Sequence, residues 1–192
     1  MSQYSEGQTH QLMEALQAKG YTPEEVTMLG QHPKLGDFRL VLKGLAEIKM
    51  MEHIISLDAD PLVPDGWRVE EHQKGGMFKW DPAQVKLHLV HGQKNGKMIE
   101  GHKLRKELSG KPVLNANVLD YLLAHPHLIP EEWKKGERGN TRHIFFWGTI
   151  YRDSGGYLYV RSLCWGGGRW HWYCHWLGLD WGGSLPTALR AS

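Results

Sequence analysis

Two groups of residues in this chain have the types that bind a transition metal. His88, His91 and His102 lie close together in "HLVHGQKNGKMIEGH", and the first two are at i, i+3 on a predicted helix face. Imidazole nitrogens at that spacing can reach one zinc ion, which would support a metal-dependent hydrolase with histidine-ligated zinc. No carboxylate stands nearby at a known zinc-site spacing, and solvated or capping histidines are the competing interpretation.

The second group is His171, Cys174 and His175. On a strand Cys174 would point away from both histidines, and no fourth ligand is near. HExxH, GxSxG, P-loop and GxGxxG motifs are absent from the sequence. Asp153 and Asp180 flank the region, but two carboxylates without a known geometry do not define a glycosidase. The residues therefore favour a binding protein over an enzyme, and no cofactor is expected.

The stretch "CWGGGRWHWYCHWLGLDWGG", residues 164–183, holds five of the nine tryptophans. At the period of a strand, one side carries Trp170, Trp172, Cys174 and Trp176, and the other carries His171, Tyr173 and His175. We expect a packed tryptophan wall whose neighbours face outward. An ordinary aromatic core or a sugar-stacking surface would have a similar composition.

The elements before this stretch are predicted to be mainly helical. Residues 6–19 form one predicted helix, and Thr22 and Pro23 are the cap and first residue of a second. A third apolar stretch covers residues 38–55. Three short helices also suit a helix-turn-helix DNA reader, but the charges are mixed and the net charge is only +2. A packing or assembly role is the simpler interpretation, and no nucleic-acid partner is expected.

The middle of the chain predicts short elements of both kinds. "WRVEEHQ" and "GMFKWD" are predicted strands around Gly75 and Gly76. Asp81 and Pro82 predict the start of a helix in "DPAQVKLHLV". Further helices are predicted in "KLRKEL", over residues 117–124, and from Pro130 onward.

After Lys135 the sequence becomes rich in strand-forming residues. Two β-rich runs flank a hairpin turn at residues 153–156, and a second turn is predicted at residues 166–168. The fold class is therefore α+β. We expect a helical region (1–57), a mixed α/β region (58–137) that packs on the C-terminal module, and a β-rich C-terminal module (138–192).

The C-terminal residues also have an unusual composition. No Lys, Glu, Gln or Met occurs after Glu137, where simple proportion predicts about 12. Strands are poor in Lys, Glu and Gln, but a complete absence exceeds that bias.

From "WRVEEHQKGG" through "LNANVLDYLLAHPHLIPEEWK" to "FFWGTIYRDSGGYLYVRSLCW" and "ALRAS", the chain resembles a family of proteins from environmental bacteria that has no assigned function. Its tail resembles the variable region of diversity-generating retroelement target proteins, which carry a C-type-lectin-like fold with a hypervariable ligand-binding surface. In that family a reverse transcriptase corrupts adenines of a template repeat, and the copy replaces the 3′ end of the target gene.

The resemblance implies which residue types vary. An AAC or AAT codon randomised at both adenines never yields Lys, Glu, Gln, Met or Trp, and the tryptophan codon contains no adenine. Every non-Trp residue of 164–185 belongs to the accessible set. The expected scaffold residues are Trp165, Trp170, Trp172, Trp176 and Trp181. The expected ligand-binding residues are Cys164, Gly166, Gly167, His171, Tyr173, Cys174, His175, Gly178, Leu179, Gly182, Gly183, Ser184 and Leu185.

The expected partner is a protein or a carbohydrate ligand. Two cysteines do not make a disulfide scaffold, and the N-terminal residues contain no apolar signal-peptide core. No run approaches the roughly 18 apolar residues of a membrane span. We therefore expect a soluble, cytoplasmic protein.

Overall fold

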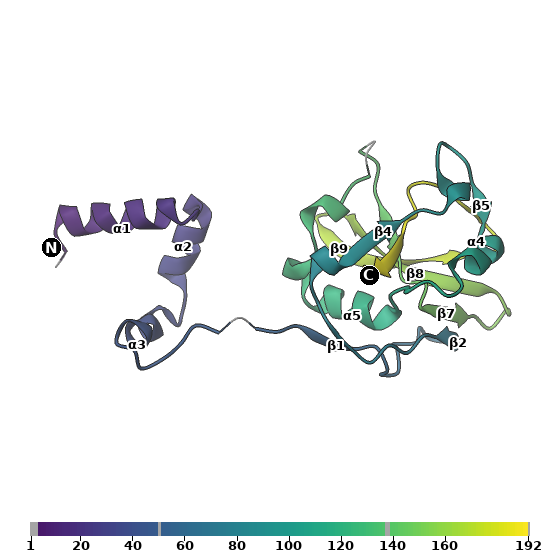
Figure 1. Cartoon of the computed structure of the whole chain (residues 1–192), viewed down its shortest axis with the longest axis horizontal. Helices are drawn as coiled ribbons and strands as arrows, with labels where there is room; N and C mark the ends of the chain where they lie inside the picture. Colours follow the sequence, from purple (N-terminus) through teal and green to yellow (C-terminus); the bar gives the residue numbers. More distant parts are fainter. Residues whose placement is uncertain (1–3, 50, 137–138, 192) are drawn as a thin grey trace. The chain divides into compact units, whose positions relative to one another are not determined.

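The chain divides into two compact units, Met1–Met51 and Glu52–Ser192. The computed structural model describes residues 4–49, 51–136 and 139–191 (Figure 1). The structure is mixed α/β, with 32% helix and 27% strand and a curled sheet. Within the described residues, no helix is both long and apolar enough to cross a bilayer.

The first unit consists of short helices. Ser5 and Thr22 each close a capping box, with Gln8 and Glu25 respectively, and Pro23 is the first residue of its helix as predicted. None of the described helical residues of this unit is buried. Its elements are α1 (Glu6–Ala18), α2 (Pro23–Gln31), η1 (Leu35–Asp37) and α3 (Phe38–Leu42).

The second unit is built on a seven-stranded sheet. Its strand order is β2-β7-β8-β6-β11-β4, and β9 pairs with β8. All its pairings are antiparallel except β6 with β11. The strands are β2 (Arg68–His72), β4 (Val85–His88), β6 (His143–Phe145), β7 (Thr149–Arg152), β8 (Leu158–Gly166), β9 (Arg169–Trp176) and β11 (Thr187–Arg190).

Smaller elements cover this sheet. Two antiparallel pairs are formed by β1 (Ile54–Ser56) with β3 (Met77–Lys79), and by β5 (Ile99–Glu100) with β10 (Asp180–Trp181). The helices are α4 (Gly101–Leu108) and α5 (Ala116–Ala124), with single turns η2 (Pro82–Gln84), η3 (His91–Gln93), η4 (Pro126–Leu128) and η5 (Glu131–Trp133). The predicted regions 58–137 and 138–192 thus share one sheet, because β2 and β4 pair with β7 and β11.

The core lies on both faces of the sheet because side chains alternate along each strand. On β8, Leu163 packs into a cluster with α5 and Trp133, whereas Val160 packs into a cluster with α4 and Trp181. Helix α5 is also tied to the sheet by charge. Arg161, which is 1% exposed, donates to both carboxylate oxygens of Asp120 at 2.7 and 3.0 Å.

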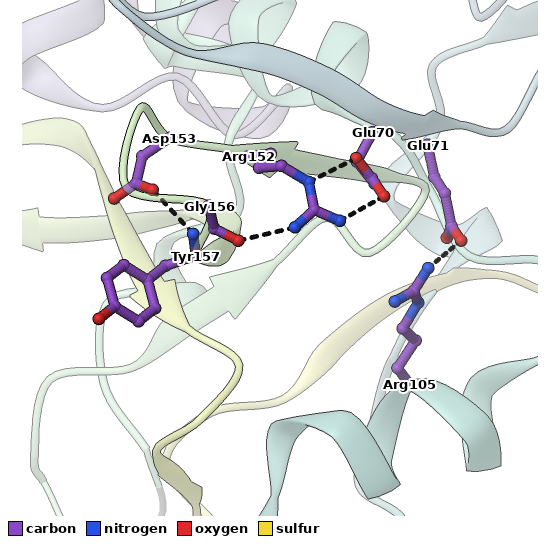
Figure 2. A network of polar contacts seen from close by, with 7 residues as sticks. All are labelled: Glu70, Glu71, Arg105, Arg152, Asp153, Gly156 and Tyr157. Carbon is purple, nitrogen blue, oxygen red and sulfur yellow. Dashed lines mark hydrogen bonds and ion pairs between the residues drawn. The ribbon is translucent and has the colours of Figure 1, made fainter.

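A polar network holds β2, β7 and α4 at one side of the sheet (Figure 2). Arg152 donates to both carboxylate oxygens of Glu70 across the β2–β7 ladder and to the carbonyl of Gly156 at 2.7 Å. The Asp153 carboxylate accepts from the Tyr157 amide at 2.8 Å and closes the β7–β8 turn. Arg105 of α4 pairs with Glu71. Asp153 therefore has a turn-closing role here.

Two predictions for the middle of the chain were wrong. "DPAQVKLHLV" is not a helix: after the single turn η2 it becomes β4, which pairs with β11 from Val85 to His88. Only its start is as expected, with Asp81 accepting from the Ala83 amide. The helix expected from Pro130 is the single turn η5. Pairing with the distant C-terminal strand outweighs the local helix signal.

Candidate ligand-binding surface

The hairpin of β8 and β9 carries most of the predicted ligand-binding residues. Its register is unbroken from Tyr159–Trp176 to Gly166–Arg169, and the turn consists of Gly167 and Gly168 with φ of 57° and 78°. Two positive φ values match the type I′ turn that suits a twisted hairpin. Gly167 is therefore a conformational requirement, and most side chains would be strained at this predicted ligand-binding position.

One side of β9 carries Trp170, Trp172, Cys174 and Trp176, as the alternation predicts. Because no bulge interrupts the register, Cys174 lies on this side, opposite Arg161. The expected uniform wall is wrong at Trp172, which is 40% exposed. The Arg161 guanidinium carbon lies 4.6 Å from its ring centroid. A cation therefore covers part of this indole, while the rest faces solvent.

The other expected scaffold tryptophans have different neighbours. Trp170 packs against the α5 side of the core, and Trp176 meets Tyr157 edge to face at 5.2 Å. The Lys134 ammonium lies 3.8 Å from the ring of Trp165. Trp181 is fully buried on the opposite sheet face.

The opposite side of β9 presents a row of polar aromatic residues. The ring of Tyr173, which is 57% exposed, lies between His143 and His171 at centroid distances of 5.9 and 5.8 Å. His175 packs edge to face on Trp181 at 4.7 Å. His143, from β6, was not among the predicted site residues, because only the β6–β8–β9 register brings it beside β9.

Burial affects the protonation of this row. It lowers the pKa of His143, and nearby His171 and His175 lower it further. Burial also lowers the pKa of His175, opposed by the hydrogen bond to the Asp180 carbonyl. Both imidazoles are therefore mainly neutral at pH 7, and the N–H of His175 is engaged by the Asp180 carbonyl, which leaves its other nitrogen as an acceptor.

The C-terminal loop (residues 177–186) is anchored by the buried side chains of Leu177 and Trp181 and, at the predicted ligand-binding positions, through its backbone. The Gln93 side chain, 1% exposed, donates to the carbonyls of Gly182 and Leu185 at 3.2 and 3.0 Å. The amides of Gly101 and His143 donate to the carbonyls of Leu179 and Ser184, respectively. These four predicted ligand-binding positions are thus held by atoms that every residue type possesses.

The glycines of the surface differ in the room they leave for a side chain. A Cβ at Gly182 would make ordinary contact with Met98 at 3.7 Å, and one at Gly183 would lie 3.3 Å from the Gln93 carbonyl. At Gly166 the nearest atom belongs to the His171 ring at 2.8 Å. At Gly178 a Cβ would lie 2.4 Å from the Trp176 ring. Gly178 is therefore a packing requirement rather than a free surface position.

Cys164, which was among the predicted ligand-binding residues, is buried in the structure. Its side chain is 1% exposed, and its thiol donates to the His171 carbonyl at 3.7 Å. Burial raises the pKa of this thiol to about 11. Cys164 therefore belongs to the packed interior at β8 rather than to the exposed surface.

The structure separates the histidines of the zinc hypothesis. His88 ends β4, His91 begins η3 and His102 lies in α4, so the expected i, i+3 helix face does not exist. In the second group, Cys174 points to one side of β9, and His171 and His175 point to the other. Among residues 4–49, 51–136 and 139–191, no three His, Cys, Asp or Glu side chains are grouped to hold a metal ion.

A different histidine cluster was missed by the sequence reasoning. His53 lies 2.9 Å from the Tyr121 hydroxyl, and His125 stacks on the Tyr121 ring at 4.3 Å. His127 meets His53 and His125 edge to face. Stacking of i, i+4 aromatic residues at the end of α5 is a local signal, but the approach of His53, which directly precedes β1, is a tertiary contact.

Comparison of the chain with protein-family models, with curated proteins and with solved structures gave no match in any of the three.

Proposed function

We propose that this protein is a ligand-binding display protein. In this proposal Glu52–Ser192 is a C-type-lectin-like module and a target of a diversity-generating retroelement. Its variable surface consists of the His171, Tyr173 and His175 side of β9 together with the C-terminal loop. The ligand is a protein or a carbohydrate that contacts these side chains.

The backbone anchoring of the C-terminal loop carries the proposal. A surface that changes its side chains must keep its shape by contacts that survive every replacement. Hydrogen bonds from Gln93, Gly101 and His143 reach only main-chain oxygens of the loop. Preformed loops also lose little conformational entropy on binding, which favours affinity.

The geometry narrows the set of variable positions. Tyr173 and Leu179 are 57% and 46% exposed, and Gly182 has room for a Cβ. Cys164, Gly167 and Gly178 are fixed by burial, by positive φ and by the Trp176 ring, respectively. The proposal therefore assigns variation to His171, Tyr173, His175, Leu179, Gly182 and Ser184.

The experiment is a pair of matched libraries sorted for folded protein. The first randomises His171, Tyr173, Leu179, Gly182 and Ser184 with the codon set that adenine mutagenesis of AAC or AAT produces. The control library uses the same codons at five buried positions: Gln93, Leu104, Asn115, Phe146 and Leu163. We expect most members of the first library to fold and most of the control library to fail. Equal loss of folding in both would contradict the proposal.

The surrounding gene provides a second test. A neighbouring reverse transcriptase and a near-copy of the 3′ end that differs at adenines would support the retroelement assignment. A near-copy that differs equally at all four bases would exclude adenine-specific mutagenesis.

A further inference from the structure

A cavity of about 520 Å³ adjoins the C-terminal loop. Polar groups on its lining include Lys94, Asn95, Asn140, Arg142 and Ser184, and Leu87 and Pro186 add apolar surface. This volume is in the range of pockets that hold small organic ligands. The cavity lies beside the β9 surface, because Ser184 accepts from the amide of His143.

The charges on the described part of the cavity lining have one sign. Lys94 and Arg142 are its cations, and none of its described lining residues is acidic. Within the described ranges, neither cation pairs with a carboxylate. Arg142 donates from Nη1 to the Glu132 carbonyl at 3.1 Å, which orients the guanidinium without neutralising it.

The nearby strand β4 lies in the same positive field. Burial lowers the pKa of His88, and the charges of Lys111, Lys94 and Lys86 lower it further. Lys94 therefore belongs to a local group of cations. Such a group attracts an anion to the cavity mouth.

The cavity is also held in shape by a buried side chain. Gln93 lines it and bonds the carbonyls of Gly182 and Leu185, and its Oε1 accepts from the Val90 amide at 3.2 Å. Lys94 and Asn95 follow directly in sequence. Amide and cationic donors thus adjoin the loop whose side chains we propose to vary.

We propose that this cavity binds a small organic molecule through an oxyanion group held by Lys94 and Arg142. Asn95, Asn140 and Ser184 offer hydrogen bonds to the same ligand, and Leu87 and Pro186 contact its apolar part. Charge-assisted bonds from guanidinium and ammonium groups are the stronger polar contacts available to such a ligand. The inference deepens the proposed function, since Gly183 and Ser184 lie both in the cavity and in the C-terminal loop.

The test is a titration of the full chain with inorganic phosphate at constant ionic strength, in which binding is monitored by the NMR chemical shifts of the backbone amides. Saturable shifts should centre on residues 94–96, 140–142 and 183–184. Lys94→Gln and Arg142→Gln should each weaken binding about tenfold, the cost of one charge-assisted contact. Lys97→Gln and Arg68→Gln remove the same charge outside the cavity and should leave the affinity unchanged.

A second arm compares glucose 6-phosphate with glucose. We expect only the phosphorylated sugar to bind, and added sodium chloride should weaken it. The inference would be overturned if glucose bound as tightly as glucose 6-phosphate, or if the control variants weakened binding as much as Lys94→Gln and Arg142→Gln. Shifts scattered over surface lysines would also overturn it. The folding libraries test the proposed function separately. A protein that binds no phosphate can still yield a first library that folds, and a first library that fails to fold does not change the result of the phosphate titration.

Discussion

The tryptophans of residues 164–183 stand in two kinds of environment. Trp181 is fully buried and packs on Phe145 at 4.4 Å and on Trp147 at 4.7 Å. Trp172 is 40% exposed and rests on Arg161. The buried indole supports the sheet, whereas the exposed one has surface left for a ligand.

Trp181→Ala should therefore lower the free energy of unfolding by about 3–5 kcal/mol, as expected for a buried large aromatic residue. Trp172→Ala should lower the free energy of unfolding by only about 1–2 kcal/mol, because folding buries a smaller part of the Trp172 side chain than of the Trp181 side chain. Urea denaturation of both variants measures the difference. Equal costs would show that Trp172 is a core residue.

The histidines beside β9 should make stability depend on pH. The folded-state pKa values of His143 and His175 lie below the ordinary value of 6.5. Between 6.5 and those lower values the unfolded chain binds more protons, so stability falls as pH falls through this window. His175→Gln and His143→Gln should each reduce the slope of unfolding free energy against pH between 7 and 5, measured by urea denaturation. An unchanged slope in both variants would contradict this origin.

At the scale of elements, loop 177–186 depends on one side chain far away in sequence. Gln93→Leu would leave the carbonyls of Gly182 and Leu185 without their partner. We expect a loss of roughly 2–4 kcal/mol of unfolding free energy and faster hydrogen exchange at the Leu185 amide. Ser184→Ala keeps every backbone anchor and should change stability by less than about 0.5 kcal/mol. A larger effect of Ser184→Ala than of Gln93→Leu would mean that side chains, not the backbone, hold the loop.

At the scale of the whole molecule, both buried clusters belong to Glu52–Ser192. The described helical residues of the first unit contribute no buried side chain. Residues 52–192 alone should therefore melt at the same temperature as the full chain, measured by circular dichroism. A clearly lower melting temperature would assign the N-terminal unit a role in stability.

Local rules determined several features from the sequence alone. These features follow from hydrogen bonds and periodicities within a few residues. They are the side-chain alternation of β9, the turn closed by Asp153, the Thr22–Pro23 start of α2 and residues 117–124 of α5. Such signals survive in any tertiary context that keeps the element. The mixed composition likewise indicated helices and strands together.

Only the tertiary structure decided the remaining features. Val85–His88 became a strand because β11 supplies its partner from the end of the chain. Trp172 is 40% exposed although Trp170, on the same side of β9, packs against the core cluster on the α5 side. Gln93 reaches the C-terminal loop about 90 residues away, and Arg142 and Lys94 line the same cavity. Such contacts depend on how distant segments pack, and local propensities do not encode the packing of distant segments.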